Sequence, residues 1–265
     1  MNVTELLSEM RLDEAIQATI EIVKKKPMAV EHRVSLAQLI CFTGDLERAD
    51  QQLETSQMQD PEALMKISMY RQLIRGEMTR RESFEQGRPP ELLQDPTPLV
   101  ELNMKLLIAL RENDIQQVGQ LSQQIEEQRP VYSGTCDGQA FEDMRDMDDR
   151  TIFFFEVITS TGKYYWVPFD SIESIEFHPP VEPCDLLWRR ATMNAADQDG
   201  DVFIPVLYPG SSASESTAVK LGRETLWDGE PPLPAIGFGQ RMFWIGDDEK
   251  TIMELQSLKF NRTTT

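Results

Sequence analysis

The chain has 265 residues, and its 45 acidic residues outnumber the 26 basic ones, which gives a formal net charge of −19. Because nucleic acid and anionic lipid both require a positive surface, this charge argues against either as a partner. The first residues, Met1–Leu7, lack the basic and apolar stretches of a signal peptide, and no later segment reaches the roughly 20 apolar residues of a membrane span. The three cysteines (Cys41, Cys136 and Cys184) lie far apart with no CxxC pair, which favours reduced, buried thiols and a cytoplasmic protein.

Prolines recur at a regular interval in the first half of the chain. Pro27, Pro61, Pro96 and Pro130 are 34, 35 and 34 residues apart, and Leu12–Ala15 is echoed 34 residues later by Leu46–Ala49. A period of 34 residues is that of helix–turn–helix solenoids, in which one repeat buries its apolar face only by stacking on the next. We therefore expect tetratricopeptide-like helical repeats over residues 1–130, with protein binding rather than catalysis as their task.

Apolar residues at helical spacing predict helices over residues 13–25, 28–42, 64–74 and 99–110. Gly44 can supply a left-handed cap at the end of the second, and Asp45 can cap the helix that follows. The positions that match the packing residues of a tetratricopeptide repeat are Leu36, Ala37, Ile40, Ala49 and Leu53. Residues 82–97 are poor in apolar side chains, so one repeat is expected to be distorted or partly looped. An irregular helical bundle is the alternative.

After Pro130 the pattern changes to short β-branched and aromatic segments. Residues 131–138 are rich in turn formers and are predicted to be the interdomain linker. Residues 151–158 and 163–167 flank a turn and predict a β-hairpin. Further strands are predicted over residues 172–177, 187–193, 202–208 and 241–245, with a closing element near 252–258. The expected fold is α+β in two domains, a helical-repeat domain over 1–130 and a small antiparallel β-rich α+β domain over 131–265.

The acidic segment Glu142–Arg150 is the strongest local candidate for chemistry. Crowded carboxylates can hold a divalent cation or raise one another's pKa, so a metal-dependent hydrolase built on residues 142–149 is the alternative function. The segment lacks the glycine and ligand spacing of an EF-hand, however, and a short exposed helix with Asp146–Arg150 and Arg145–Asp149 ion pairs is the simpler interpretation. The sequence holds no phosphate-binding loop, nucleophile elbow or His/Cys ligand pair, so we expect no cofactor, no metal and no enzyme.

A set of motifs in the second half carries a family resemblance. They are Phe141–Arg150, Glu156–Phe169, Leu186–Arg189, Val202–Ser211, Leu221–Arg223, Asp228 and Gly237–Arg241. In this order and spacing they closely resemble the ImpE family, also called TagJ or SciE, accessory proteins of bacterial type VI secretion. The resemblance implies a cytoplasmic, non-enzymatic protein that binds the N-terminal helix of the small sheath subunit and modulates sheath assembly or recycling.

Some motif residues are candidates for the partner site. Tyr164 and Trp166 are predicted to face one side of a strand, with Tyr165 on the other. Beside Trp188 and Arg189 they could form a platform for an amphipathic helix, since aromatic residues and arginine dominate interface hot spots. The alternative is that Trp166 and Trp188 belong to the core. Motif residues expected to serve either the fold or binding are Asp143, Arg145, Asp148, Asp149, Tyr208, Gly239, Gln240 and Arg241.

Arginines of these motifs also have a structural interpretation. Arg145, Arg189 and Arg241 can be buried partners of the acidic residues in the 142–149 segment. The negative charge of the whole chain further predicts that a bound helix is cationic on its polar face.

Overall fold

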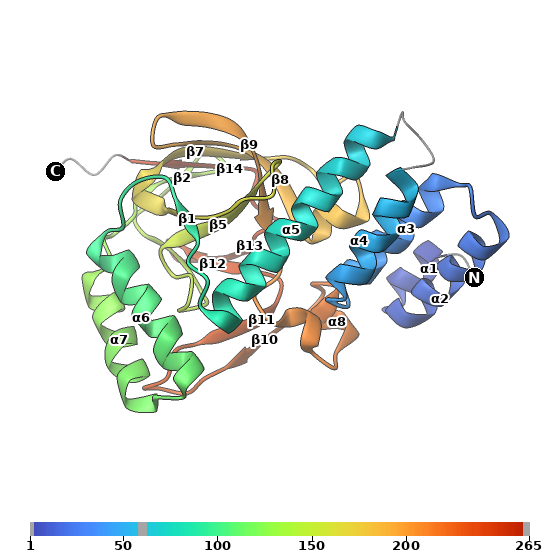
Figure 1. Cartoon of the computed structure of the whole chain (residues 1–265). Helices are drawn as coiled ribbons and strands as arrows, with labels where there is room; N and C mark the ends of the chain where they lie inside the picture. The colour runs from blue at the N-terminus through green and yellow to red at the C-terminus, as the bar shows by residue number, and fades with distance from the viewer. Residues whose placement is uncertain (1–2, 58–62, 262–265) are drawn as a thin grey trace.

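The computed structural model describes residues 3–57 and 63–261 (Figure 1). A helical part comes first, and the strand-rich part follows it. The helices of the first part are α1 Val3–Ser8, α2 Leu12–Lys25, α3 Val30–Cys41, α4 Leu46–Gln57, α5 Leu64–Gln86, α6 Pro98–Glu112 and α7 Ile115–Gln128. In the described residues no helix is long and apolar enough to cross a membrane.

The hairpin of α3 and α4 has the predicted tetratricopeptide-like packing. Gly44 ends the turn with a φ of +78°, and the side chain of Asp45 accepts a hydrogen bond of 3.2 Å from the backbone N–H of Arg48. The five matching positions are all buried: Leu36, Ala37, Ile40, Ala49 and Leu53. The first repeat is therefore confirmed, and its cap is the one expected.

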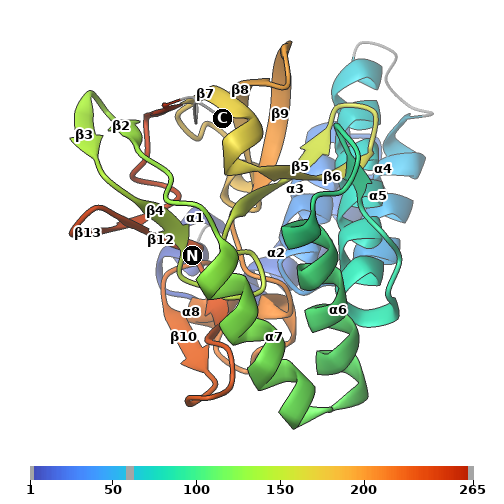
Figure 2. The same cartoon turned by 90° about the vertical axis from the view of Figure 1, so that its left-hand side faces the viewer.

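The stacking of helices does not continue to residue 130. The long α5 packs on α4 at one end and on the sheet at the other, so α1–α4 and the α6–α7 pair lie at opposite ends of the molecule (Figures 1 and 2). The chain leaves α5 at Gly87, whose φ is +81°, and then forms the short strand β1 (Glu91–Leu92) at a sheet edge. The apolar-poor segment 82–97 thus interrupts the array, because it connects α5 to the sheet instead of to another repeat.

Within residues 3–57 and 63–261 the main sheet has nine strands in the order β1-β6-β5-β9-β8-β7-β14-β2-β3. Its pairs are antiparallel except that of β1 with β6. The strands after β1 are β2 Gly134–Cys136, β3 Gln139–Phe141, β5 Phe154–Thr159, β6 Tyr164–Pro168, β7 Ile172–Phe177, β8 Trp188–Ala195, β9 Gln198–Pro205 and β14 Ser257–Phe260. The predicted hairpin is confirmed as β5–β6, whereas the predicted linker 131–138 is wrong, since it contains β2.

Two smaller sheets and several single turns of helix complete the strand-rich part. The order β13-β12-β4 makes one sheet, and β10 with β11 makes the other. Their strands are β4 Met144–Asp146, β10 Thr225–Asp228, β11 Ile236–Gly239, β12 Met242–Ile245 and β13 Asp248–Thr251. The short helices are η1 Phe169–Ser171, η2 Pro183–Leu186, η3 Ser211–Ala213 and α8 Thr217–Lys220.

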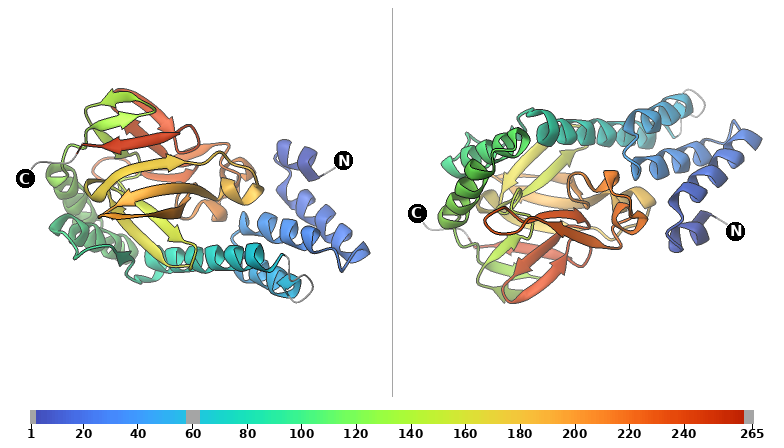
Figure 3. Two further views of the ribbon diagram at one scale, coloured as in Figure 1. Left: turned by 90° about the horizontal axis from the view of Figure 1, so that it is seen from above. Right: turned by 90° about the horizontal axis from the view of Figure 1, so that it is seen from below.

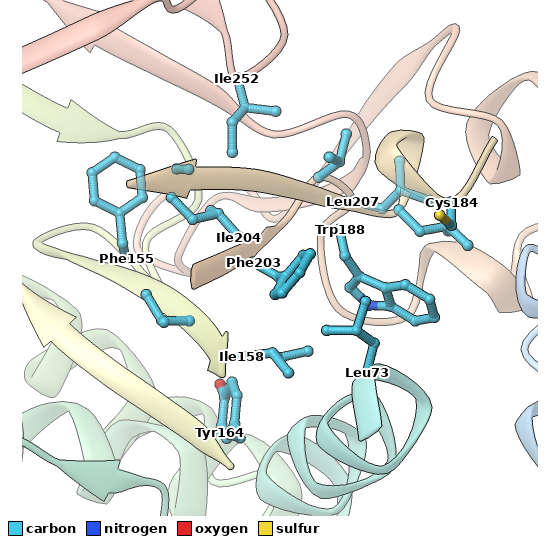
Figure 4. Close-up of a cluster of buried hydrophobic side chains, with 14 of the residues drawn as sticks. Leu73, Phe155, Ile158, Tyr164, Cys184, Trp188, Phe203, Ile204, Leu207 and Ile252 are labelled. Carbon is cyan, nitrogen blue, oxygen red and sulfur yellow. The ribbon is translucent and has the colours of Figure 1, made fainter. Parts of the chain in front are cut away.

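Strand β5 is packed on both faces. On one face Ile158 lies against Gly76 of α5, where a larger residue would have no room. On the other, Phe155 packs against Phe169 and Phe243, with ring centroids 5.1 and 5.3 Å apart. Figure 4 shows Leu73 of α5 next to Trp188 and Ile158 of the sheet. One hydrophobic core therefore runs through both parts of the chain, although the secondary structure changes between α7 and β2 as predicted. Whether residues 1–130 and 131–265 fold separately stays a prediction.

Candidate functional site

The four residues predicted to bind a partner are all buried. Tyr164 and Trp166 of β6 are each 1% exposed, and Trp188 and Arg189 of β8 are each 3% exposed. The indole N–H of Trp166 donates to the Tyr164 hydroxyl at 2.7 Å. As predicted, these two share a face of β6 and Tyr165 lies on the other. Their burial favours the core interpretation, and partner contact by these side chains stays a prediction.

Trp188 and Arg189 hold other segments in place. The indole N–H of Trp188 donates to the carboxylate of Glu77 on α5 at 3.0 Å. Arg189 donates to the backbone carbonyls of His178 and Ile252, and its guanidinium lies 5.0 Å from the ring centre of Phe177. The expected pairing of Arg189 with an acidic residue of the 142–149 segment is thus not observed.

A buried ionic network joins α5 to the motif residues. Glu156, which is fully buried, accepts two hydrogen bonds of 2.9 Å from Arg80 of α5 and one from Arg241. Arg241 in turn lies 3.3 Å from the carboxylate of Asp146, which also accepts a 2.8 Å hydrogen bond from Tyr208. Two arginines and two carboxylates therefore meet in the interior, where each charge depends on its partners.

The pKa values of the two carboxylates in this network, Glu156 and Asp146, are shifted in opposite directions. Burial alone would raise the pKa of Glu156, but the charges of Arg80 and Arg241 outweigh it and hold the pKa at about 2. Burial likewise raises the pKa of Asp146. Here Arg241 opposes the effect only in part, while the nearby Asp148 adds to it, so the pKa reaches about 7. Asp146 is therefore the member of the network that titrates near neutral pH.

The acidic segment 142–149 is not a helix. It contains β4 followed by a turn, in which Asp148 pairs with Arg150 at 2.6 Å and also accepts the backbone N–H of Gly237. The predicted Asp146–Arg150 pair is wrong, because Asp146 faces Arg241 from the end of β4. The predicted Arg145–Asp149 pair is present, but across the turn rather than along a helix.

The remaining motif residues fix the surrounding loops. Asp143 pairs with Arg129 at 2.6 Å, next to the C-terminal end of α7. Gly239 has a φ of +112° and donates its N–H to the hydroxyl of the buried Ser211. The carbonyl of Gln240 accepts a 2.8 Å hydrogen bond from Thr225. All of these contacts lie within the protein, so they give these motif residues a role in the fold.

A cleft of about 430 Å³ opens beside the network, between the helical part and the strand-rich part. The α3–α4 turn and α5 form one wall, with Phe42, Arg81 and Phe84, and Tyr208 and Phe238 line the other. Gly44 allows the two walls to approach, because a side chain there would meet the hydroxyl of Ser212 at 2.7 Å.

The chemistry available to these residues is limited by their partners. The carboxylates of Asp146 and Asp148 are each bound to an arginine, and among the described residues no group of three His, Cys, Asp or Glu side chains could hold a metal ion. The three cysteines are buried and free, and burial raises the pKa of each, so their thiols are protonated near neutral pH. The contacts described above join α5 to the strand-rich part.

Glu156 and Arg80 were not predicted from the sequence. Glu156 is a single charge inside the apolar run Ile152–Ile158, and such a residue signals a buried carboxylate that needs a cation. Arg80 carries no comparable signal, because it is one of several charged residues near the end of α5.

These observations define a class of protein in which helical repeats are locked to a strand-rich part by buried ion pairs. A family model described as "ImpE protein" matches residues 138–259. A relative named type VI secretion system accessory component TagJ, from Pseudomonas aeruginosa, is 30% identical over 260 residues, which cover 98% of this chain and 91% of the relative. A crystal structure of a Vibrio parahaemolyticus protein, 30% identical, matches with a TM-score of 0.91 over 98% of each chain. The chain belongs to the ImpE family, in which the name TagJ is also used.

Proposed function

We propose that this protein is a non-enzymatic, cytoplasmic accessory component of a type VI secretion system. The observation that carries the proposal is the 30% identity to TagJ over 98% of the chain, which includes both the helical and the strand-rich part. The pairing of the buried carboxylates with arginines supports it, because a metal-dependent hydrolase would need such side chains free to bind a metal or to exchange a proton with a substrate.

The partner that we propose is the small sheath subunit, bound through its amphipathic N-terminal helix. A chain with a net charge of −19 attracts a helix that is cationic on its polar face, and apolar anchors of that helix would then determine how long it stays bound. Binding this helix would let the protein modulate sheath assembly or recycling by covering a segment that other factors would otherwise meet.

A binding experiment with the purified full chain tests this proposal. The small sheath subunit is titrated with and without its first helix, at low and at physiological salt. We expect binding that requires the helix and weakens as salt rises. Equal binding of both forms would show that the helix is not the recognised element, and the absence of binding by either form would contradict the proposed partner.

A second measurement tests the non-enzymatic assignment. Thermal unfolding of the protein is followed with divalent cations and with nucleotides present. A ligand that binds the folded state raises the unfolding temperature by mass action, so we expect no stabilisation. A large and saturable stabilisation by a divalent cation, lost in an Asp148→Asn, Asp149→Asn variant that remains folded, would instead favour the hydrolase alternative.

A further inference from the structure

Two adjoining hollows lie at the edge of the main sheet, away from the cleft described above. The first, of about 580 Å³, lies between the segment after β1 and the start of β7. The second, of about 210 Å³, lies on the face of β5 and β6 opposite to α5, beside the β8–β9 hairpin. Leu93 lines both hollows, and the adjacent residues Ala195 and Ala196 each line one of them. We call the two hollows together the acidic groove.

The floor of the acidic groove is apolar. Trp166, Val100 and Ile172 line the first hollow, and Val157, Tyr165 and Met193 line the second. Tyr165 is only partly buried, unlike the neighbouring Tyr164 and Trp166. Figure 3 (left) looks onto the yellow and orange strands of this sheet, with the teal helix α5 running along one side of them. Most of these side chains are buried, so the partly exposed Tyr165 and Leu93 are the apolar contacts that the groove offers to a partner's anchor residues.

The rim of the groove carries charges of one sign. Its acidic residues are Asp95, Asp170, Glu173, Asp197, Asp199 and Asp201. Among the described residues that line the two hollows there is no lysine and no arginine. Asp201 pairs at 2.5 Å with Arg190, which lies outside the lining. The groove therefore has a negative rim around an apolar floor.

The carboxylate of Asp170, on the rim of the groove, is partly desolvated. By accessible area Asp170 is an exposed residue, yet the surrounding walls desolvate its carboxylate enough to raise its pKa above the ordinary value. Only backbone hydrogen bonds oppose this shift, and no cation of the described chain contributes. A positive group placed here would be favourable, because it would neutralise a carboxylate that is already partly desolvated.

These observations indicate what kind of molecule binds in the acidic groove. A second copy of this chain would bring another net charge of −19 to an acidic rim and would be repelled. A cationic amphipathic helix satisfies both features, since its basic face meets the rim and its apolar stripe meets the floor. The two hollows, which share Leu93, can each receive an apolar side chain of such a helix.

We propose that the acidic groove is the docking site for a cationic amphipathic helix, which, resting on the proposed function, is the N-terminal helix of the small sheath subunit. On β6 the groove takes in Tyr165, which lies on the opposite face from Tyr164, and the edge of Trp166 in the first hollow. Rim carboxylates attract the helix during association, and the apolar floor retains it.

Charge reversal with a matched control tests whether the helix binds in the acidic groove. The full chain with Asp95→Lys and Asp170→Lys is compared with a control that carries Glu47→Lys and Glu249→Lys. Glu47 lies on α4 and Glu249 on β13; both are exposed, and neither lines the groove. Both variants change the net charge by the same amount, so a difference between them reports position. Thermal melts and circular dichroism establish that each is folded.

The probe is a labelled synthetic peptide of the sheath subunit's first helix, with association and dissociation rates measured over a range of salt. We expect the groove variant to associate about tenfold more slowly than the control and with a weaker dependence on salt. We also expect Leu93→Ala to speed dissociation more than association. If the lysine variant melts early, Asp95→Asn with Asp170→Asn is compared with Glu47→Gln and Glu249→Gln in the same way.

Each outcome decides between the two proposals. If the wild type binds and both charge variants bind alike, the groove is not the site, while the proposed partner stands. If the wild type does not bind the peptide, the proposed partner is wrong and the groove assignment fails with it. Slower association of the groove variant alone supports both.

Discussion

At the junction of α5 with the sheet, the carboxylates of Glu156, Asp146 and Asp148 are buried, and each lies beside an arginine. Along the acidic groove, Asp95, Asp170 and their neighbours surround a hollow whose described lining has no basic residue. The first arrangement uses charge to hold two parts of one chain together, because a buried carboxylate must be neutralised where it lies. In the second, as we propose, the carboxylates face a cationic partner. Several motif residues therefore hold the fold together at the junction, whereas Tyr165 and Trp166 of the Glu156–Phe169 motif line the groove that we propose as the binding surface.

The largest effect is expected at the junction. Arg80→Ala leaves the fully buried Glu156 with one of its two arginines, and we expect the free energy of unfolding to fall by about 3–5 kcal/mol. Arg88→Ala is the control, since Arg88 pairs with Glu82 on the surface and should contribute about 0–1 kcal/mol. Urea unfolding measures both. Similar losses in the two variants would show that the junction is not held by its buried ion pairs.

A smaller effect is expected where α5 touches the sheet through Gly76. In Gly76→Ala the new methyl group would meet Ile158, so either α5 or β5 must shift, at a cost of about 1–3 kcal/mol. Gly119→Ala in α7 is the matched control. Its nearest neighbour would be the carbonyl of Pro232 at 3.4 Å, and the gain in helix propensity should stabilise that variant by up to about 1 kcal/mol. Stabilisation by both substitutions would contradict the close packing of α5.

The two carboxylates of the network, Asp146 and Glu156, should affect the pH dependence of stability in opposite directions. The pKa of Asp146 is raised to about 7, so its contribution is fully present below its ordinary pKa near 3.8 and is lost as the pH rises through 7. The pKa of Glu156 is lowered to about 2, so its contribution is present above its ordinary value of 4.5 and is lost as the pH falls towards 2.

Between pH 4.5 and 8 the change in stability at this network should therefore come from Asp146. We expect the urea midpoint of the wild type to fall across this range, and Asp146→Asn to reduce that fall because the amide does not titrate. An Asp201→Asn variant, altered on the surface, should keep the slope of the wild type. A wild-type midpoint that rises from pH 4.5 to 8 would contradict the direction of the Asp146 shift.

The sequence predicted elements whose signals are local. The α3–α4 turn with Gly44 and Asp45, the β5–β6 hairpin and strand β7 follow from caps, turn residues and alternation. Residues 131–138 were predicted to be a linker because Gly134 and Gly138 favour turns. In the structure Gly134 starts β2, where a side chain would collide with the carbonyl of Lys259 on β14. The partner strand is distant in the sequence, so no local pattern could reveal the pairing.

The candidate site was predictable in composition but not in position. The aromatic content of β6 and the alternation of Tyr164, Tyr165 and Trp166 were both evident. Which face lies against α5 was not, because that depends on where Arg80 meets Glu156, 76 residues later in the chain. The acidic groove was hidden for the same reason, since it joins the segment after β1 to the tip of the β8–β9 hairpin.

Two neighbouring tyrosines of β6 allow a final test of the comparison between the junction and the groove. Tyr164 faces the junction, where its hydroxyl donates to Glu156, whereas Tyr165 lines the acidic groove. Tyr164→Phe keeps the ring and removes a buried hydroxyl, so it should cost about 1–3 kcal/mol of stability and leave affinity for the helix peptide unchanged. Tyr165→Ala should cost about 1 kcal/mol or less of stability and weaken binding about tenfold, since it removes an anchor from the groove floor. The reverse result, with Tyr165→Ala binding like the wild type and a folded Tyr164→Phe binding less tightly, would move the partner site to the junction at Tyr164 and Trp188.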